Sequence, residues 1–182
     1  MCPSTGRVIL RPPEANDRGA FLAAVRHSRM LHRPWVAPPT TPAAFDEYLE
    51  RARSEAHRGF LVVHHQTGAL VGVINLNHII AGRLRSAFLG YYGFEPFAGQ
   101  GLMQEGMELV LRHAFRKLKL HRLEANIQPG NRASIALARR CGFVREGFSR
   151  RYLKIGGRWR DHERWAVLSE DWSARRRSRS AR

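Results

Sequence analysis

Apolar residues recur along the chain with two different periods, and these periods divide it into strands and helices. Alternating or continuous apolar runs predict strands over 7–11, 59–66, 69–80, 86–94, 121–128, 143–155 and 158–170. Apolar residues three or four positions apart predict helices over about 17–25, 42–52, 102–118 and 131–140. Prolines and glycines separate these segments, and Thr67-Gly68 and Gly156-Gly157 mark hairpin turns.

The order of these elements indicates an α/β protein with a mixed sheet. One strand, two helices and three strands are followed by a helix, a strand, a helix and a final hairpin. The length of 182 residues suits one domain. We expect a loose N-terminus over 1–6, the domain over 7–172, and a disordered tail over 173–182, because "RRRSRSAR" has no apolar pattern.

The chain is strongly basic, with 31 Lys and Arg residues against 15 Asp and Glu residues and a net charge of +16. Five arginines lie in the last eight residues, but the remainder is also basic. A basic surface favours polyanions such as RNA, a ribosome or a phosphate-rich cofactor. A solvated basic surface without any such partner explains the composition equally well.

Several classes of protein are disfavoured by simple features of the chain. No apolar run approaches the roughly 20 residues of a membrane span, and residues 1–10 carry no signal-peptide core. Cys2 and Cys141 are the two cysteines, which argues against a disulfide framework and against a metal site. We expect a cytoplasmic protein in which Cys141 serves as a small buried apolar side chain.

The stretch "PFAGQGLMQEG", residues 96–106, places two glycines directly before a predicted helix. The first turn of a helix has backbone N–H groups without partners and a partial positive charge. Gly99 and Gly101 would let phosphates approach these groups closely, and Gln100 could add a side-chain donor. Neither a Walker A loop nor G-x-G-x-x-G is present. The alternative is a glycine turn that only joins a strand to a helix.

Four motifs in sequence carry a family resemblance. They are "FLGYYGF", "FAGQGLM" before a long helix, "HRLEANIQPGNRASIALARRCGF" and "YLKIGGRWRDH". In this order they resemble the GNAT superfamily of acyl-CoA-dependent N-acyltransferases, in particular the RimJ/RimL branch that acetylates ribosomal-protein N-termini. The resemblance runs from about Val8 to Leu168. It implies a GNAT fold, with a mixed, mostly antiparallel central sheet flanked by helices, and acetyl-CoA as acyl donor without a metal.

The resemblance also implies where the donor binds. The pantetheine arm would lie along Tyr92, Gly93 and Phe94, and Asn131 would contact it. The remaining cofactor-binding positions form the glycine loop and the helix start: Gly99, Gln100, Gly101, Leu102 and Met103. This chain has Ala98 where the family usually has Gln or Arg, and Met103 where it has Gly or Ala.

The reaction implied by the resemblance is direct attack of an amine on the thioester, without a covalent enzyme intermediate. RimL-like relatives carry a Glu base nineteen residues after the serine that corresponds to Ser134, and this chain has Leu153 there. The base is therefore left open between Asp161 and His162, with Glu146 as a weaker candidate. Ser134 and Tyr152 are the candidate proton donors to the leaving thiolate.

The acceptor is expected to be the α-amino group of a ribosomal or other protein, held near Trp35 and Trp159. About a fifth of an α-amine is neutral just above pH 7, against about one lysine in a thousand. Two alternatives remain open. The first is an enzyme of the same fold that acylates a small-molecule amine or transfers a succinyl group. The second is a basic protein that binds RNA or the ribosome and catalyses no reaction. The Arg-rich tail is a candidate ribosomal RNA contact, and the protein could be a monomer or a homodimer.

Overall fold

The computed structural model describes residues 6–180, so most of the expected loose N-terminus, residues 1–5, lies outside the described part, as do residues 181–182. Its centre is one seven-stranded sheet in the order β1-β2-β3-β4-β5-β7-β6. Only β4 and β5 run parallel, so the sheet is mixed and mostly antiparallel as expected. The strands are β1 (Val8–Arg11), β2 (Arg58–His64), β3 (Leu70–Ile80), β4 (Ser86–Gly93), β5 (Arg122–Ile127), β6 (Val144–Ile155) and β7 (Arg158–Leu168).

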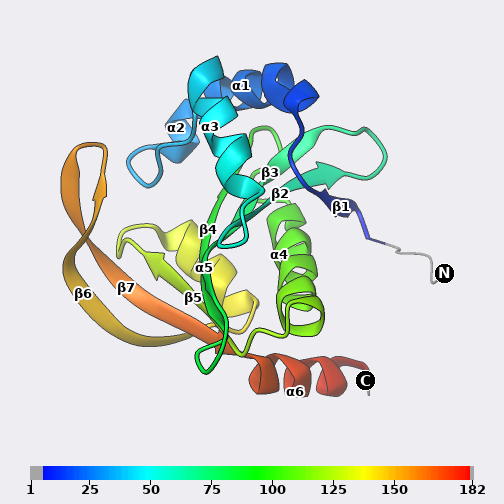
Figure 1. Ribbon diagram of the computed structural model, residues 1–182, viewed down its shortest axis with the longest axis vertical. Coiled ribbons are helices and arrows are strands. Elements are labelled where there is room, and N and C mark those ends of the chain that lie inside the picture. Colours follow the sequence, from blue (N-terminus) through cyan, green and yellow to red (C-terminus); the bar gives the residue numbers. More distant parts are fainter. Residues whose placement is uncertain (1–5, 181–182) are drawn as a thin grey trace.

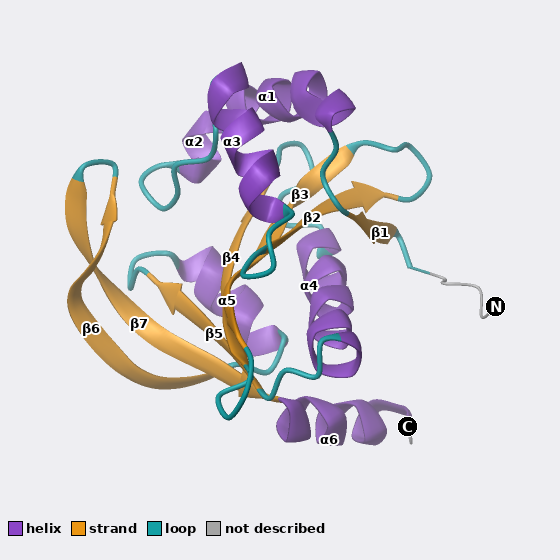
Figure 2. Ribbon diagram, viewed as in Figure 1, coloured by secondary structure: helices purple, strands orange, loops and turns teal. Residues whose placement is uncertain are grey.

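Helices cover both faces of this sheet (Figures 1 and 2). One group follows β1, and consists of the 3₁₀ turn η1 (Ala15–Asp17), α1 (Arg18–His27), α2 (Arg29–His32) and α3 (Pro42–Ala52). The other group consists of α4 (Leu102–Arg112), its π-helical continuation η2 (His113–Lys117), α5 (Arg132–Arg140) and α6 (Ser169–Ser180). The expected α/β order and the GNAT-type architecture are confirmed.

Two hydrophobic cores arise because successive side chains of a strand point to opposite faces. Leu61 and Val63 of β2 pack with the aromatic residues of α1 and α3, whereas Val62 packs on the face that carries α4. Gly106 of α4 lies directly against Val62, where an added Cβ would come within 2.8 Å of the valine methyl groups. The sheet around β2 is thus covered on both faces, and the sheet opens where two of its strands separate.

The separation occurs between β4 and β5. Their ladder runs only from Ser86↔Arg122 to Leu89↔Ala125. Beyond that last pair, β4 stays hydrogen-bonded to β3 as far as Gly93, while β5 stays with β7 as far as Ile127. Because each strand follows its outer neighbour, a V-shaped opening forms in the middle of the sheet and leaves one edge of β4 without a strand partner.

The C-terminal segment differs from the disorder expected for 173–182, because α6 is helical as far as Ser180. Its anchor is Trp172, which is 2% exposed, packs against Phe115 and donates from Nε1 to Glu108 at 3.2 Å. Arg175 donates to the Arg140 carbonyl at 2.7 Å, and the Arg176 guanidinium lies over the indole. Aromatic stacking and a backbone acceptor thus fold a segment whose composition alone favours disorder.

Replacing Trp172 with alanine is expected to destabilise the protein by about 3–5 kcal/mol, the usual cost of a cavity of this size. Guanidinium denaturation measures the loss. Trp159→Ala is the matched control: that indole is 61% exposed, so its removal should change the free energy of unfolding by no more than about 0.5 kcal/mol. Equal effects from both substitutions would contradict the anchoring role of α6.

Candidate functional site

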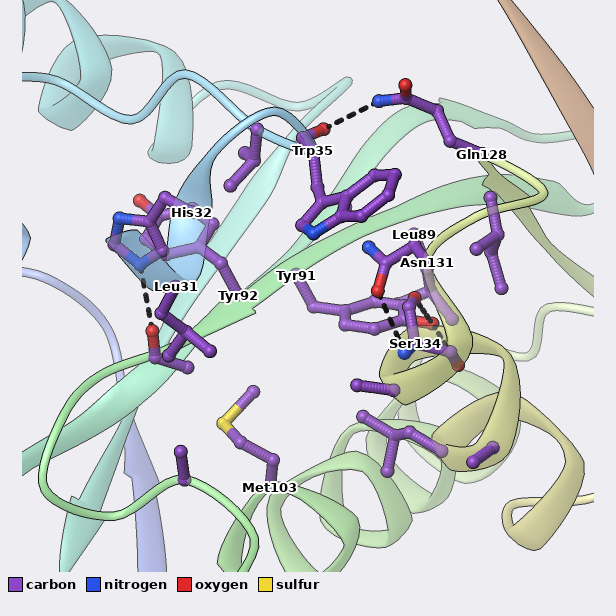
Figure 3. A pocket seen from close by; sticks show the side chains of 18 of the residues that line it. Leu31, His32, Trp35, Leu89, Tyr91, Tyr92, Met103, Gln128, Asn131 and Ser134 are labelled. Atoms are coloured by element: carbon purple, nitrogen blue, oxygen red, sulfur yellow. Dashed lines mark hydrogen bonds between the residues drawn. The ribbon is translucent and has the colours of Figure 1, made fainter. Parts of the chain in front are cut away.

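The V between β4 and β5 opens into a cleft of about 430 Å³. The start of α4, the first turn of α5, the loop after α2 and the β6–β7 hairpin complete its walls, and Figure 3 shows the side chains around it. Among the residues that the sequence singled out, those lining the cleft are Trp35, Tyr92, Gly93, Phe94, Gly99, Gly101, Met103, Asn131, Ser134 and His162.

One end of the cleft is the glycine loop before α4. Gly99 and Gly101 have φ values of 76° and 78°, a conformation that favours glycine over residues with a Cβ. Gly101 caps the helix without any side chain, and in the described chain the N–H groups of Leu102 and Met103 have no hydrogen-bond acceptor. Arg7 braces the loop by donating to the Gln100 carbonyl at 3.1 Å. Free amides, positive charge and open space are the requirements of a phosphate site.

Two residues expected in the cofactor site contribute less than the sequence suggested. Leu102 is 2% exposed and packs its side chain in the core, which leaves only its backbone N–H for a ligand. The Gln100 side chain donates back to the Pro96 carbonyl at 2.9 Å, so it stabilises the turn in this structure. Neither residue lines the cleft.

The unpaired edge of β4 forms the long wall of the cleft. His32, which is 3% exposed, donates from Nε2 to the Gly93 carbonyl at 2.9 Å and packs edge-on against Tyr92 (Figure 3). Burial lowers the pKa of His32, so the ring is neutral at pH 7. A strand edge that ends at a glycine loop with free amides fits a pantetheine arm followed by a pyrophosphate group.

The opposite wall is the first turn of α5. Asn131 caps this helix, since its Oδ1 accepts from the Ser134 N–H at 3.1 Å. The Ser134 hydroxyl donates to the Tyr91 hydroxyl at 2.8 Å, and Tyr91 donates to the Ser134 carbonyl at 3.3 Å. Burial raises the pKa of Tyr91 well above its usual range, so the phenol stays protonated. Ser134 therefore faces the cleft with a fixed hydroxyl.

The remaining catalytic candidates lie on the β6–β7 hairpin, and only one of them, His162, lines the cleft. His162 is 1% exposed, lines the cleft and donates from Nδ1 to the Arg160 carbonyl at 2.9 Å, which leaves Nε2 as a lone-pair acceptor. Burial lowers the pKa of His162 despite that hydrogen bond and the nearby Asp161. Asp161 lies outside the cleft and accepts from the Arg151 N–H at 2.7 Å. Tyr152 packs its ring against His162, 6.1 Å between centroids, and does not line the cleft.

The two tryptophans expected near the acceptor are also separated. Trp35 lies over the cleft on the loop after α2, where Gln128 donates to its carbonyl at 3.2 Å (Figure 3). Trp159 lies on β7 near the hairpin tip, is 61% exposed and does not line the cleft. Leu153, at the position of the RimL-type Glu, does line it, so that wall is apolar.

Sequence reasoning missed several polar residues at the site, among them Arg7, His32, Tyr91 and Asn126. His32 and Tyr91 lie in segments that were recognised, but only the folded chain brings them to Gly93 and Ser134. Asn126 offered a usable signal, because it is a polar position in a strand whose alternate residues are apolar. The expected buried state of Cys141 is confirmed at 0% exposure.

Comparison with known proteins identifies the class that this fold and cleft define. The model of the acetyltransferase (GNAT) domain family matches residues 7–144. The chain therefore belongs to the GNAT acetyltransferase family, and it is an N-acetyltransferase that transfers an acetyl group.

Particular relatives fall into more than one acceptor group. The chain is 29% identical to the [ribosomal protein uS5]-alanine N-acetyltransferase of Escherichia coli, with 93% of this chain and 92% of that protein covered. RimJ of Mycobacterium smegmatis, solved in complex with CoA-disulfide, superposes with a TM-score of 0.85 at 28% identity, covering 97% of this chain and 90% of that one. A spermidine N(1)-acetyltransferase of Vibrio cholerae is 27% identical, with 91% and 95% covered.

Metal clusters and membrane-spanning helices are both absent from residues 6–180. No group of three or more His, Cys, Asp or Glu side chains could hold a metal ion within that range. Among its helices none is long and apolar enough to cross a membrane.

Proposed function

We propose that this enzyme acetylates the N-terminal α-amino group of a protein, with ribosomal proteins as the first acceptors to test. The observation that carries the proposal is the chemistry of the acceptor end of the cleft. A neutral His162 and Trp35 both line the cleft, and no Asp or Glu is found among the cleft-lining residues of the described chain.

A cleft lining without carboxylates favours an acceptor with one positive charge over an acceptor with several. A polyamine or an aminoglycoside carries several positive charges, which a binding site must pair with carboxylates or leave at high cost. An N-terminal residue brings one ammonium group, followed by neutral peptide that can pack against Trp35 and Leu153. Its low pKa also means that a weak base such as a neutral imidazole is sufficient.

The proposed roles follow from the hydrogen bonds at each wall. Acetyl-CoA supplies an activated acyl group, held by the loop amides at Leu102 and Met103 and by the free edge of β4. His162 Nε2 takes the proton of the incoming ammonium, and the neutral nitrogen then forms the C–N bond as the C–S bond breaks. The nitrogen's second proton passes to solvent. The thiolate takes a proton from the Ser134 hydroxyl, which gives up its hydrogen bond to Tyr91 for this step and regains a proton from solvent.

The experiment that tests this function uses acetyl-CoA and peptides beginning with Ala, Ser, Thr or Met, each also prepared with a blocked N-terminus and an internal lysine. Mass spectrometry should detect one acetyl group on the free peptides and none on the blocked ones. Spermidine, offered at the same concentration, should be turned over at least about a hundred-fold more slowly, because the cleft lacks paired carboxylates. Faster turnover of spermidine than of every peptide would reject the proposal.

A further inference from the structure

Asn126 is the polar residue nearest the point where β4 and β5 separate. The last ladder pair is Leu89↔Ala125, so Gly90 and Asn126 are the first residues beyond it. Both line the cleft, and Gly90 brings no side chain to fill the space. The narrow end of the V, opposite the glycine loop, is therefore occupied by the Asn126 carboxamide.

The side chain of Asn126 points to the face from which an acceptor can enter. Ala125 and Ile127 on either side are buried in the core that contains α4 and α5, so Asn126 points the other way. Gln128, on the same face, donates to the Trp35 carbonyl, which places this face beneath the loop after α2. Asn126 thus lies on the acceptor side of the sheet.

His162 shares that face. Asn126 pairs with Arg164 across the antiparallel β5–β7 ladder, so His162, two residues earlier on β7, is its diagonal neighbour. Diagonal neighbours in such a ladder lie roughly 7 Å apart, which leaves room for one amine nitrogen between two side chains. One partner is the His162 Nε2 lone pair, and the other is the Asn126 carboxamide.

The side-chain oxygen of Asn126 has no hydrogen-bond partner in the described chain, unlike the side-chain amides of Asn131, Gln128 and Asn75. This oxygen is buried, and no residue of the described chain accepts from Asn126 Nδ2. By contrast, Asn131 Oδ1 accepts from Ser134 N–H, Gln128 donates to Trp35, and Asn75 Oδ1 accepts from Tyr48. A buried carbonyl without a hydrogen-bond donor is unfavourable, so a ligand that donates to Asn126 Oδ1 would be favoured at this position.

We propose that Asn126 binds the acceptor amine, with Oδ1 accepting one N–H while His162 removes another proton. A carboxamide suits this position because it accepts a hydrogen bond without holding the nitrogen as an ammonium, which a carboxylate would do. The inference rests on the proposed amine-acetyltransferase function and adds to it the group that orients the nitrogen lone pair toward the thioester carbon.

The test compares the wild type with Asn126→Ala and Asn126→Asp, using CoA, acetyl-CoA and a heptapeptide that begins with alanine. For Asn126→Ala we expect the peptide Kd, measured by calorimetry at saturating CoA, to rise about ten-fold. The Kd of CoA alone should stay within two-fold. For Asn126→Asp we expect the acidic limb of kcat to move to higher pH, because the carboxylate stabilises the ammonium form.

Asn77→Ala is the matched control, since Asn77 lies on β3 outside the cleft and its removal should change neither peptide binding nor the pH profile. A peptide Kd within two-fold of the wild type for Asn126→Ala, or an unmoved acidic limb for Asn126→Asp, overturns the inference while the acetylated wild-type peptide still supports the function. A wild type that neither binds nor acetylates the heptapeptide rejects the proposed function itself.

Discussion

Replacing His162 with glutamine is expected to lower kcat for N-terminal peptide acetylation by roughly 10²–10⁴-fold, the usual contribution of a positioned general base. Glutamine keeps the volume and a hydrogen-bonding end but has no proton acceptor of comparable basicity. Acetyl-CoA binding should be unchanged, because the glycine loop and the β4 edge lie at other walls of the cleft. Steady-state kinetics with the alanine-initiated peptide, together with calorimetry for acetyl-CoA, separate these two effects.

The pH profile gives a second signature of the same base. Burial lowers the pKa of His162 from its usual 6.5, so the imidazole is unprotonated at neutral pH. The enzyme should therefore lose activity only when the pH falls through this lowered pKa. The wild type should therefore keep kcat from pH 7 downward until that limb begins. In the variant, the residual rate should instead rise with pH until the α-amine is neutral, near pH 8.

A histidine control is available at the far end of the β2–β3 hairpin. His65 is exposed and lies outside the cleft, so His65→Gln should change kcat by less than two-fold. If His162→Gln retained kcat within three-fold of the wild type and kept the acidic limb, then another group would be the base, and the assignment of His162 would be wrong.

Replacing Gly101 with aspartate is expected to raise the Kd for acetyl-CoA by about 10²-fold or more. A carboxylate roughly 4 Å from a phosphate opposes it by about 4 kcal/mol at an effective dielectric constant of 20, before screening by salt. The new side chain would also cap the helix and occupy N–H groups that are free in the present structure. The site would lose both its charge and its donors.

The fold should survive this change, which makes the result interpretable. Asp tolerates positive φ better than most residues, and a Cβ at Gly101 would approach nothing closer than Arg7 Nη2 at 3.5 Å. Gly101→Asn is the uncharged control: it offers a similar cap and should weaken binding by about ten-fold at most. Equal Kd values for both variants would show that charge at this helix end is unimportant, contrary to a phosphate site.

Local patterns in the sequence determined the elements of this fold. The apolar periods of the strands and of α4 are properties of short segments, and the order of elements leaves few arrangements for the sheet. Two further local features are the Thr41 cap of α3, whose Oγ1 accepts from the Ala44 N–H at 3.2 Å, and the glycine loop before Leu102. The glycine loop that we expect to bind the phosphates was therefore visible in the sequence, because such a site is made mainly of backbone.

Only the tertiary structure decided the acceptor end. Asp161 and His162 are adjacent in sequence and both can accept a proton. Neighbours on a strand point to opposite faces, however, and the pairing with β5 puts His162 in the cleft. Asn126 lines the cleft because the β4–β5 ladder ends at Leu89↔Ala125. The ladder ends there because β4 follows β3 and β5 follows β7. The Arg-rich C-terminal segment is helical because Trp172 packs against Phe115. Contacts between segments that are distant in sequence leave no local sequence pattern. The proposed acceptor site depends on such contacts, so the sequence alone could not predict it.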